Sequence, residues 1–169
     1  MGSSSVRPGH WVVVMGVSAS GKTTLGTLLA EALGVPFRDG DDLHPASNIR
    51  KMKSGTPLTD ADRGPWLEDV RQVLHGAENG IVIACSALKE AYRGTLRDGP
   101  RPVEFVFLAA EPALIRRRLR ERNDHFMPPW LADSQFDALE PPDETAITLP
   151  ADHPPEELVQ RVLPLLRQY

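Results

Sequence analysis

The feature that most constrains this chain is an eight-residue run, Gly16 to Thr23, which reads Gly-Val-Ser-Ala-Ser-Gly-Lys-Thr. It fits the pattern G-x-x-x-x-G-K-[ST] at every fixed position. A short apolar stretch at 11–15 precedes it, and its last two residues open a stretch at 22–33 whose apolar residues recur at helical spacing. A glycine-rich turn between a strand and a helix directs backbone N–H groups inward at the positive helix end, where they bind phosphate. The run therefore predicts an ATP or GTP site. The alternative is an ordinary Gly/Ser turn with a solvated lysine.

The residues of this loop have distinct expected tasks. Lys22 can reach the β- and γ-phosphates, and the Thr23 hydroxyl can bind Mg²⁺. Ala19 lies at a variable position of the motif and should be tolerated there if its φ is negative. The predicted ATP contacts from this segment are Gly16, Ser18, Ala19, Ser20, Gly21, Lys22, Thr23 and Thr24.

Strand-like and helix-like segments alternate along the chain. We predict strands over 11–15, 35–37, 81–85, 103–108 and 146–149, and helices over 22–33, 45–53, 60–78, 87–97, 112–122 and 155–167. This alternation is typical of an α/β fold with three layers, in which helices cover both faces of a five-stranded parallel sheet. Pro164 should kink or fray the last helix. A chain of 169 residues has room for one core, so we expect one domain over 11–169 after a flexible tail over 1–10.

Composition excludes several classes of protein. A net charge of −4 argues against a protein that coats nucleic acid, and no apolar run approaches the ~20 residues that span a bilayer. The single cysteine, Cys85, excludes an intramolecular disulfide framework and fits a cytoplasmic location. The charge is segregated, because residues 1–122 carry +3 and residues 123–169 carry −7. We therefore expect neither nucleic acid nor membrane as a partner.

Three carboxylates, Asp39, Asp41 and Asp42, follow the second predicted strand. Metal-dependent phosphoryl transfer needs a carboxylate near Mg²⁺, and the third predicted strand carries none. Ligands of open α/β sheets bind at the carboxyl ends of the strands, which is where these residues fall. If the chain is extended there, Asp39 and Asp41 point to the same side. The alternative is an Asp/Gly turn with a helix cap.

Taken together, these segments resemble one family closely, the small phosphate-loop gluconokinases, which are relatives of shikimate and adenylate kinases. The matching residues, besides the phosphate loop, are 39–45, Asn48, Lys51, Met52, 54–55, 57–58, 62–63, 65–67, 85–89, 92–93, 118–119, Arg122, 125–128 and 134–136. The resemblance covers about 16–168. It implies a P-loop fold of the nucleoside monophosphate and shikimate kinase type, with helices that cover the substrate at about 43–79 and a mobile lid at about 123–142.

The resemblance also implies an activity, the ATP-dependent phosphorylation of D-gluconate at its terminal 6-hydroxyl. The products are 6-phospho-D-gluconate and ADP, and the enzymes are usually cytoplasmic homodimers. By similarity, Asp41 would orient the attacking hydroxyl or accept its proton, and Asp39 would hold Mg²⁺ through water. Lys22 and Arg122 join Asp41 as catalytic candidates, and Arg118 and Arg122 are candidates for ATP contacts.

The substrate pocket needs a cation for a carboxylate and polar groups for hydroxyls. Arg63 can grip a carboxylate in a fork, although a surface ion pair with Asp60 or Asp62 would explain it equally well. His44, Ser86 and Lys89 could bind hydroxyls or the transferred phosphate, and His44 could instead be a loop or cap residue. Arg93, four residues after Lys89 on a predicted helix, should share its face and approach phosphate.

Five arginines within 116–122 mark the base of the expected lid. A closing lid can place arginine on developing charge and exclude water. The alternative, a solvated helix face, fits Arg116, Arg117 and Arg120 best. His125 could lie over the closed site, and the Pro128-Pro129-Trp130 run should stiffen the lid. A kinase for another polyol acid or a nucleotide, or a non-catalytic ATP-dependent switch, remains open from sequence.

Overall fold

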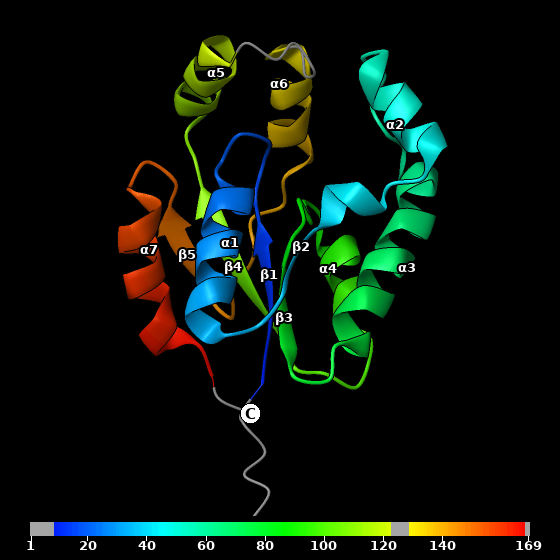
Figure 1. Cartoon of the computed structure of the whole chain (residues 1–169). Coiled ribbons are helices and arrows are strands. Elements are labelled where there is room, and N and C mark those ends of the chain that lie inside the picture. The colour runs from blue at the N-terminus through cyan, green and yellow to red at the C-terminus, as the bar shows by residue number, and fades with distance from the viewer. Residues whose placement is uncertain (1–8, 123–128, 168–169) are drawn as a thin grey trace, which may run out of the picture.

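A computed structural model describes residues 9–122 and 129–167 of the chain. Five strands form one sheet in the order β2-β3-β1-β4-β5, and every neighbouring pair is parallel (Figure 1). The strands are β1 (His10–Met15), β2 (Phe37–Asp39), β3 (Gly80–Ala84), β4 (Val103–Ala109) and β5 (Ile147–Pro150). The predicted five-stranded parallel sheet is confirmed.

Helices lie on both faces of this sheet (Figure 1). They are α1 (Lys22–Leu33), α2 (Ala46–Lys53), α3 (Asp60–Gly76), α4 (Glu90–Arg97), α5 (Pro112–Glu121), α6 (Pro129–Ala138) and α7 (Pro155–Val162), with 3₁₀ turns η1 (Gly40–Leu43) and η2 (Leu163–Leu165). The helices α3 and α4 pack on one face, and α1 and α7 pack on the other. In the part of the chain that the structure describes, no helix has the length and apolar character needed to cross a membrane.

Alternate side chains of β1 feed two separate cores. Val13 and Met15 pack with the apolar residues of α3 and α4, whereas Val12 and Val14 pack with those of α1 and α7, and all four are fully buried. Each such side chain contributes roughly 1.5–3 kcal/mol relative to an exposed one. A strand buried on both faces explains the continuous apolar run of the sequence.

The register of the central strands brings their carboxyl ends to one edge. Ala84 at the end of β3 lies opposite both Asp39 of β2 and Val14 of β1. Gly16, just after β1, donates its N–H to the carbonyl of Ser86 at 3.3 Å. The phosphate loop, the acidic turn η1 and the segment after β3 therefore meet at this edge.

Two predicted elements begin two or three residues later than expected. Gly34 ends α1 with φ +71°, and Val35 is used in that cap, since its N–H donates to the carbonyl of Ala30 at 3.0 Å. The strand β2 consequently begins at Phe37 rather than at residue 35. The helix α4 begins at Glu90 rather than at residue 87, because Ala87 has φ +45° and residue 89 is extended.

The ends of the predicted domain differ in smaller ways. His10, assigned to the tail from sequence, is the first residue of β1, and residues 1–8 lie outside the described residues. Pro164 falls in η2, where the last α-helix has already ended, as its ring requires. Within the expected lid, 129–138 forms α6, while 123–128, including His125, lies outside the described residues.

Candidate active site

The phosphate loop adopts the expected strand, turn and helix arrangement. Gly21 has φ +103° and is the N-cap of α1. Gly16 has φ +149°, and a Cβ there would lie 2.9 Å from the Ser20 hydroxyl oxygen and 3.0 Å from the Leu108 carbonyl oxygen. Both glycines are therefore required by backbone conformation or by space.

Lys22 folds back over the loop that carries it. Its Nζ donates to the carbonyls of Gly16 at 2.9 Å and Val17 at 3.0 Å. Burial lowers the pKa of Lys22, and the nearby Asp41 carboxylate opposes that shift. The amine is thus held at the floor of the cavity, beside the place where the loop binds phosphate.

Ala19 does not meet the condition under which it was expected to be tolerated easily. Its φ is +63°, in the left-handed region, where a non-glycine residue costs roughly 1–2 kcal/mol. Local strain of this kind persists only where the surrounding structure fixes the backbone. Two carbonyls of this stretch, those of Ala19 and Ser20, accept from the Arg118 guanidinium at 3.0 and 3.1 Å, which supplies such a constraint.

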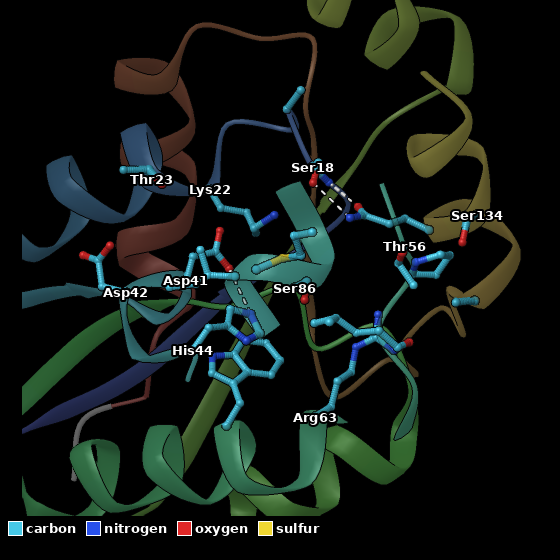
Figure 2. Close-up of a pocket in the computed structure, with 18 of the residues that line it drawn as sticks. Ser18, Lys22, Thr23, Asp41, Asp42, His44, Thr56, Arg63, Ser86 and Ser134 are labelled. Atoms are coloured by element: carbon cyan, nitrogen blue, oxygen red, sulfur yellow. Dashed lines mark hydrogen bonds and ion pairs between the residues drawn. The ribbon is translucent and has the colours of Figure 1, made fainter. Parts of the chain in front are cut away.

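The helix α6 docks directly on the phosphate loop through Gln135. The Ser18 N–H donates to Gln135 Oε1 at 2.6 Å, and Gln135 Nε2 donates to the Ser18 hydroxyl at 3.0 Å, as the dashed lines at Ser18 in Figure 2 show. The sequence indicates Gln135 only through the resemblance to the family, so this contact is an addition to the predicted site. It places α6 against the phosphate loop.

A threonine and an aspartate meet at the start of α1. Thr23 Oγ1 donates to Asp39 Oδ2 at 3.0 Å, and Asp39 Oδ1 accepts from the Asp41 N–H at 3.0 Å. A hydroxyl beside a carboxylate, with phosphates and waters to complete six oxygen ligands, suits Mg²⁺. Within residues 9–122 and 129–167, no group of three or more His, Cys, Asp or Glu side chains is arranged to hold a metal without such help.

Asp41 lies in the turn η1 and not on an extended strand, so the predicted alternation with Asp39 is wrong. Asp39 instead is the N-cap of that turn. The Asp41 side chain is still 70% exposed and lines the cavity. Although water reaches most of this side chain, the protein atoms around it remove part of its hydration and raise its pKa above the usual value, while Lys22 opposes that shift. A reachable carboxylate with a raised pKa suits a group that accepts a proton.

His44 forms the wall of the cavity next to Asp41. Its Nε2 lies 3.9 Å from Asp41 Oδ1, and its ring stacks on the buried ring of Trp66 with the centroids 4.1 Å apart. The Trp66 Nε1–H donates to the Gly40 carbonyl at 2.7 Å, which fixes α3 against η1. Burial and the Arg63 cation lower the pKa of His44 to about 4, so its imidazole is neutral at pH 7.

Arg63 lies away from Lys22 and Asp41 (Figure 2), and Lys89 lines the same cavity. Arg63 donates to the Leu58 carbonyl at 2.8 Å and lies 3.4 Å from the Tyr92 hydroxyl. Asp60 binds both the Tyr92 hydroxyl and Lys89 Nζ, the latter at 3.2 Å. The Asp60 ion pair considered for Arg63 is therefore formed by Lys89 instead.

Most of the remaining residues predicted for the site line the cavity, but Arg93 does not. The cavity has a volume of 720 Å³, and Ser86, Thr24 and Arg122 also line it. Arg93 is buried elsewhere, since its guanidinium donates to the carbonyls of Ala87 at 2.7 Å and Glu140 at 2.8 Å. The helix face that it was expected to share with Lys89 does not exist, because Lys89 is the N-cap of α4.

Arg118 and Cys85 take structural positions. Besides its two bonds to the phosphate loop, Arg118 donates to the Ala151 carbonyl at 2.7 Å and so ties the loop to the segment after β5. Burial raises the pKa of the Cys85 thiol to about 12, so this side chain is a small buried hydrophobe and not a thiolate nucleophile.

Comparison with known proteins shows the family to which the chain belongs. A family model described as shikimate kinase matches residues 18–148. The gluconokinase of Gluconobacter oxydans (strain 621H) is 44% identical over 159 residues, covering 91% of this chain and 89% of that protein. The chain belongs to the gluconokinase family.

Further relatives of that family agree with this membership. The thermosensitive gluconokinase of Escherichia coli (strain K12) is 46% identical over 138 residues, covering 79% of this chain and 73% of that protein. A gluconokinase structure from Sinorhizobium meliloti 1021 matches with a TM-score of 0.85 at 43% identity, covering 93% of this chain and 90% of that one. A shikimate kinase from Aquifex aeolicus, 20% identical with a TM-score of 0.60 over 91% of this chain and 94% of that one, shares the fold.

Proposed function

We propose that this gluconokinase family member transfers the γ-phosphoryl group of ATP to the terminal 6-hydroxyl of D-gluconate, giving 6-phospho-D-gluconate and ADP. The observation that carries the proposal is one cavity in which the phosphate loop and Asp41 face Arg63 and Lys89. The first pair suits a nucleotide and an attacking hydroxyl. The second suits a carboxylate at the far end of a short polar chain.

The reaction needs a primary hydroxyl to be aligned and deprotonated. In the proposed step the 6-hydroxyl oxygen bonds to the γ-phosphorus, the bond from that phosphorus to the bridging oxygen of ADP breaks, and the hydroxyl proton passes to Asp41. A carboxyl with a raised pKa is better able to take that proton than an ordinary aspartate. Holding donor and acceptor in line is the larger part of the catalysis.

The nucleotide side of the cavity is assigned to the phosphate loop and its neighbours. Lys22 exchanges its carbonyl partners for phosphate oxygens, and Arg122 at the end of α5 approaches the transferred group. Thr23 and Asp39 would hold Mg²⁺, which neutralises charge on the phosphates when it is bound. The helix α6 covers the loop through Gln135 and excludes water from it.

The acceptor side is assigned to Arg63, Lys89, Ser86 and His44. Arg63 and Lys89 bind the sugar-acid carboxylate, and Ser86 and His44 bind hydroxyls. The contact of Asp60 with Lys89 supports this assignment, because its carboxylate already accepts from one of the two cations that a substrate carboxylate would use. Gluconate would compete with that internal carboxylate for Lys89.

An acceptor panel tests the proposal. ADP formation is measured with gluconate, other aldonates, shikimate and nucleoside monophosphates, and gluconate should give the highest kcat/KM. Clear preference for another acceptor, or no gluconate-dependent ADP, would refute it. Arg63→Lys should raise KM for gluconate about tenfold or more with KM for ATP unchanged, since lysine lacks the bidentate fork. Arg161→Lys, on the exposed face of α7, is the matched control.

We further propose that the protein acts with Mg²⁺ as a cytoplasmic homodimer, as the family resemblance implies. Sedimentation of the purified full chain should give twice the chain mass, and fractionation of cells should find the activity in the cytoplasm. Chelation of divalent cations should abolish turnover, and added Mg²⁺ should restore it. A monomer of full activity would refute the dimeric part alone.

A further inference from the structure

The imidazole of His44 is held from three directions. Trp66 stacks on one face of the ring, with 14° between the two planes. The side chain is 4% exposed, and its Nε2 edge is directed toward Asp41 (Figure 2). The remaining ring nitrogen, Nδ1, faces the helix α2, where Asn48 Nδ2 lies 3.2 Å away.

The hydrogen bonds of Asn48 determine which nitrogen of His44 carries the proton. Asn48 Nδ2 lies 2.9 Å from the backbone carbonyl of Asp62, and a carbonyl can only accept, so this atom is the amide NH₂. An amide NH₂ has no acceptor capacity, so its second proton is donated to His44 Nδ1. That nitrogen therefore carries no proton, and the neutral ring keeps its proton on Nε2.

We propose that Asn48 is a positioning residue that holds His44 as the neutral Nε2–H tautomer, which presents this N–H to a hydroxyl of the sugar acid beside Asp41. The inference rests on the proposed function, because it names the sugar acid as the group received. Asn48 is itself buried, at 2% exposure, and does not line the cavity. It acts through His44 alone.

The charged groups around His44 make a neutral donor the useful form. Asp41 of η1 and Arg63 of α3 both approach the ring. A protonated ring would lose the Asn48 bond, since both nitrogens would then be donors, and it would also face the Arg63 cation. It would further pair with Asp41 and make that carboxylate a weaker base. A neutral N–H can bind a hydroxyl and leave Asp41 free to accept its proton.

The tautomer can be read directly from the unmodified chain. With ¹⁵N-labelled histidine, long-range ¹H–¹⁵N spectra distinguish protonated from unprotonated ring nitrogens, and His44→Gln identifies the signals by their loss. At pH 7 we expect His44 to show a bare Nδ1 and a protonated Nε2. A protonated Nδ1, in either a neutral or a charged ring, overturns the proposal.

A substitution that reverses the hydrogen bond tests the functional consequence. Asn48→Asp puts an acceptor opposite Nδ1, which should move the proton to that nitrogen and leave Nε2 bare or charge the ring. We expect kcat/KM for gluconate to fall about tenfold to a hundredfold, because a buried donor is lost from the acceptor site, while KM for ATP stays unchanged. A new acidic limb should appear in the pH profile of kcat/KM.

Asn79→Asp makes the same chemical change at an exposed position in the turn before β3 and is the matched control. Unchanged kcat/KM in Asn48→Asp would overturn the positioning role. The tautomer measurement needs no substitution at position 48. It therefore decides which nitrogen of His44 carries the proton even if Asn48→Asp fails to fold. If the acceptor panel selects another substrate, the proposed function fails while the tautomer result stands independently.

Discussion

The neutral state of His44 predicts an acid-sensitive fold. In the folded chain the pKa of His44 is lowered to about 4 from an ordinary value of 6.5. As the pH falls below 6.5, the unfolded chain therefore takes up a proton on this imidazole before the folded chain does. The stability that His44 contributes is present above that pH and is lost as the pH falls toward 4.

The size of this loss in stability follows from the shift in the pKa of His44. One pKa unit corresponds to about 1.4 kcal/mol, so the full shift is worth roughly 3 kcal/mol, of which roughly 2 kcal/mol is lost between pH 7 and pH 5. That is a large part of the roughly 5–15 kcal/mol by which a domain is stable. His44→Gln should begin about 1–2 kcal/mol less stable at neutral pH, since the stack on Trp66 and the bond from Asn48 are lost.

Urea unfolding of both proteins across this pH range measures the effect. The wild-type free energy of unfolding should approach that of His44→Gln as the pH falls, and the two should run parallel above neutral pH. A difference between the two proteins that stays constant from neutral to acid pH would refute the argument. It would mean that the folded and unfolded chains protonate this imidazole alike.

Three further perturbations test other parts of the structure. Asp41→Asn should leave ATP affinity, measured by nucleotide titration, nearly unchanged and lower kcat by about 10²–10⁴, because the proton acceptor is removed; unchanged turnover would exclude Asp41 from the mechanism. Gln135→Ala should raise ATP hydrolysis without gluconate by about threefold to tenfold, since α6 loses both of its hydrogen bonds to Ser18 of the phosphate loop; a basal rate equal to wild type would contradict that. Gly26→Ala should lower the free energy of unfolding by about 1–3 kcal/mol, because its Cβ would lie 2.6 Å from the Phe37 ring, whereas Gly94→Ala, with no atom within 4 Å, should raise it by up to about 1 kcal/mol. Equal effects of the two glycine substitutions in denaturant unfolding would refute the packing argument.

Much of the fold could be predicted because its signals are local. The helix α1 matches its predicted bounds, since its periodic leucines and Gly34 mark both the buried face and the end. The predicted start of β2 is two residues too early. An apolar residue such as Val35 is compatible both with a strand and with the cap of the preceding helix, and the sequence does not distinguish the two. The sequence does not predict α6 as a helix, since this segment has no clear apolar stripe.

The site could be predicted less completely, because the type of a residue does not show where its side chain points in the folded chain. Arg93 and Arg118 have the guanidinium that a phosphate would need, yet both donate to backbone carbonyls instead. Asn48 gave no local signal of its task, because the atoms that it links belong to residues 4 and 14 positions away. Such contacts depend on how α2 and α3 pack and are decided only in three dimensions.

The fixing of Glu140 has a mechanical consequence for α6. Glu140 donates its N–H to the Leu88 carbonyl at 2.8 Å, its own carbonyl accepts from Arg93, and its carboxylate accepts from the Glu90 N–H at 2.8 Å. The segment after α6 is therefore clamped to the same loop that carries Lys89. This end of α6 is held in place, and any movement of the helix would have to pivot there. Because that loop also carries Lys89, which lines the cavity, the position of α6 and the position of Lys89 are mechanically linked.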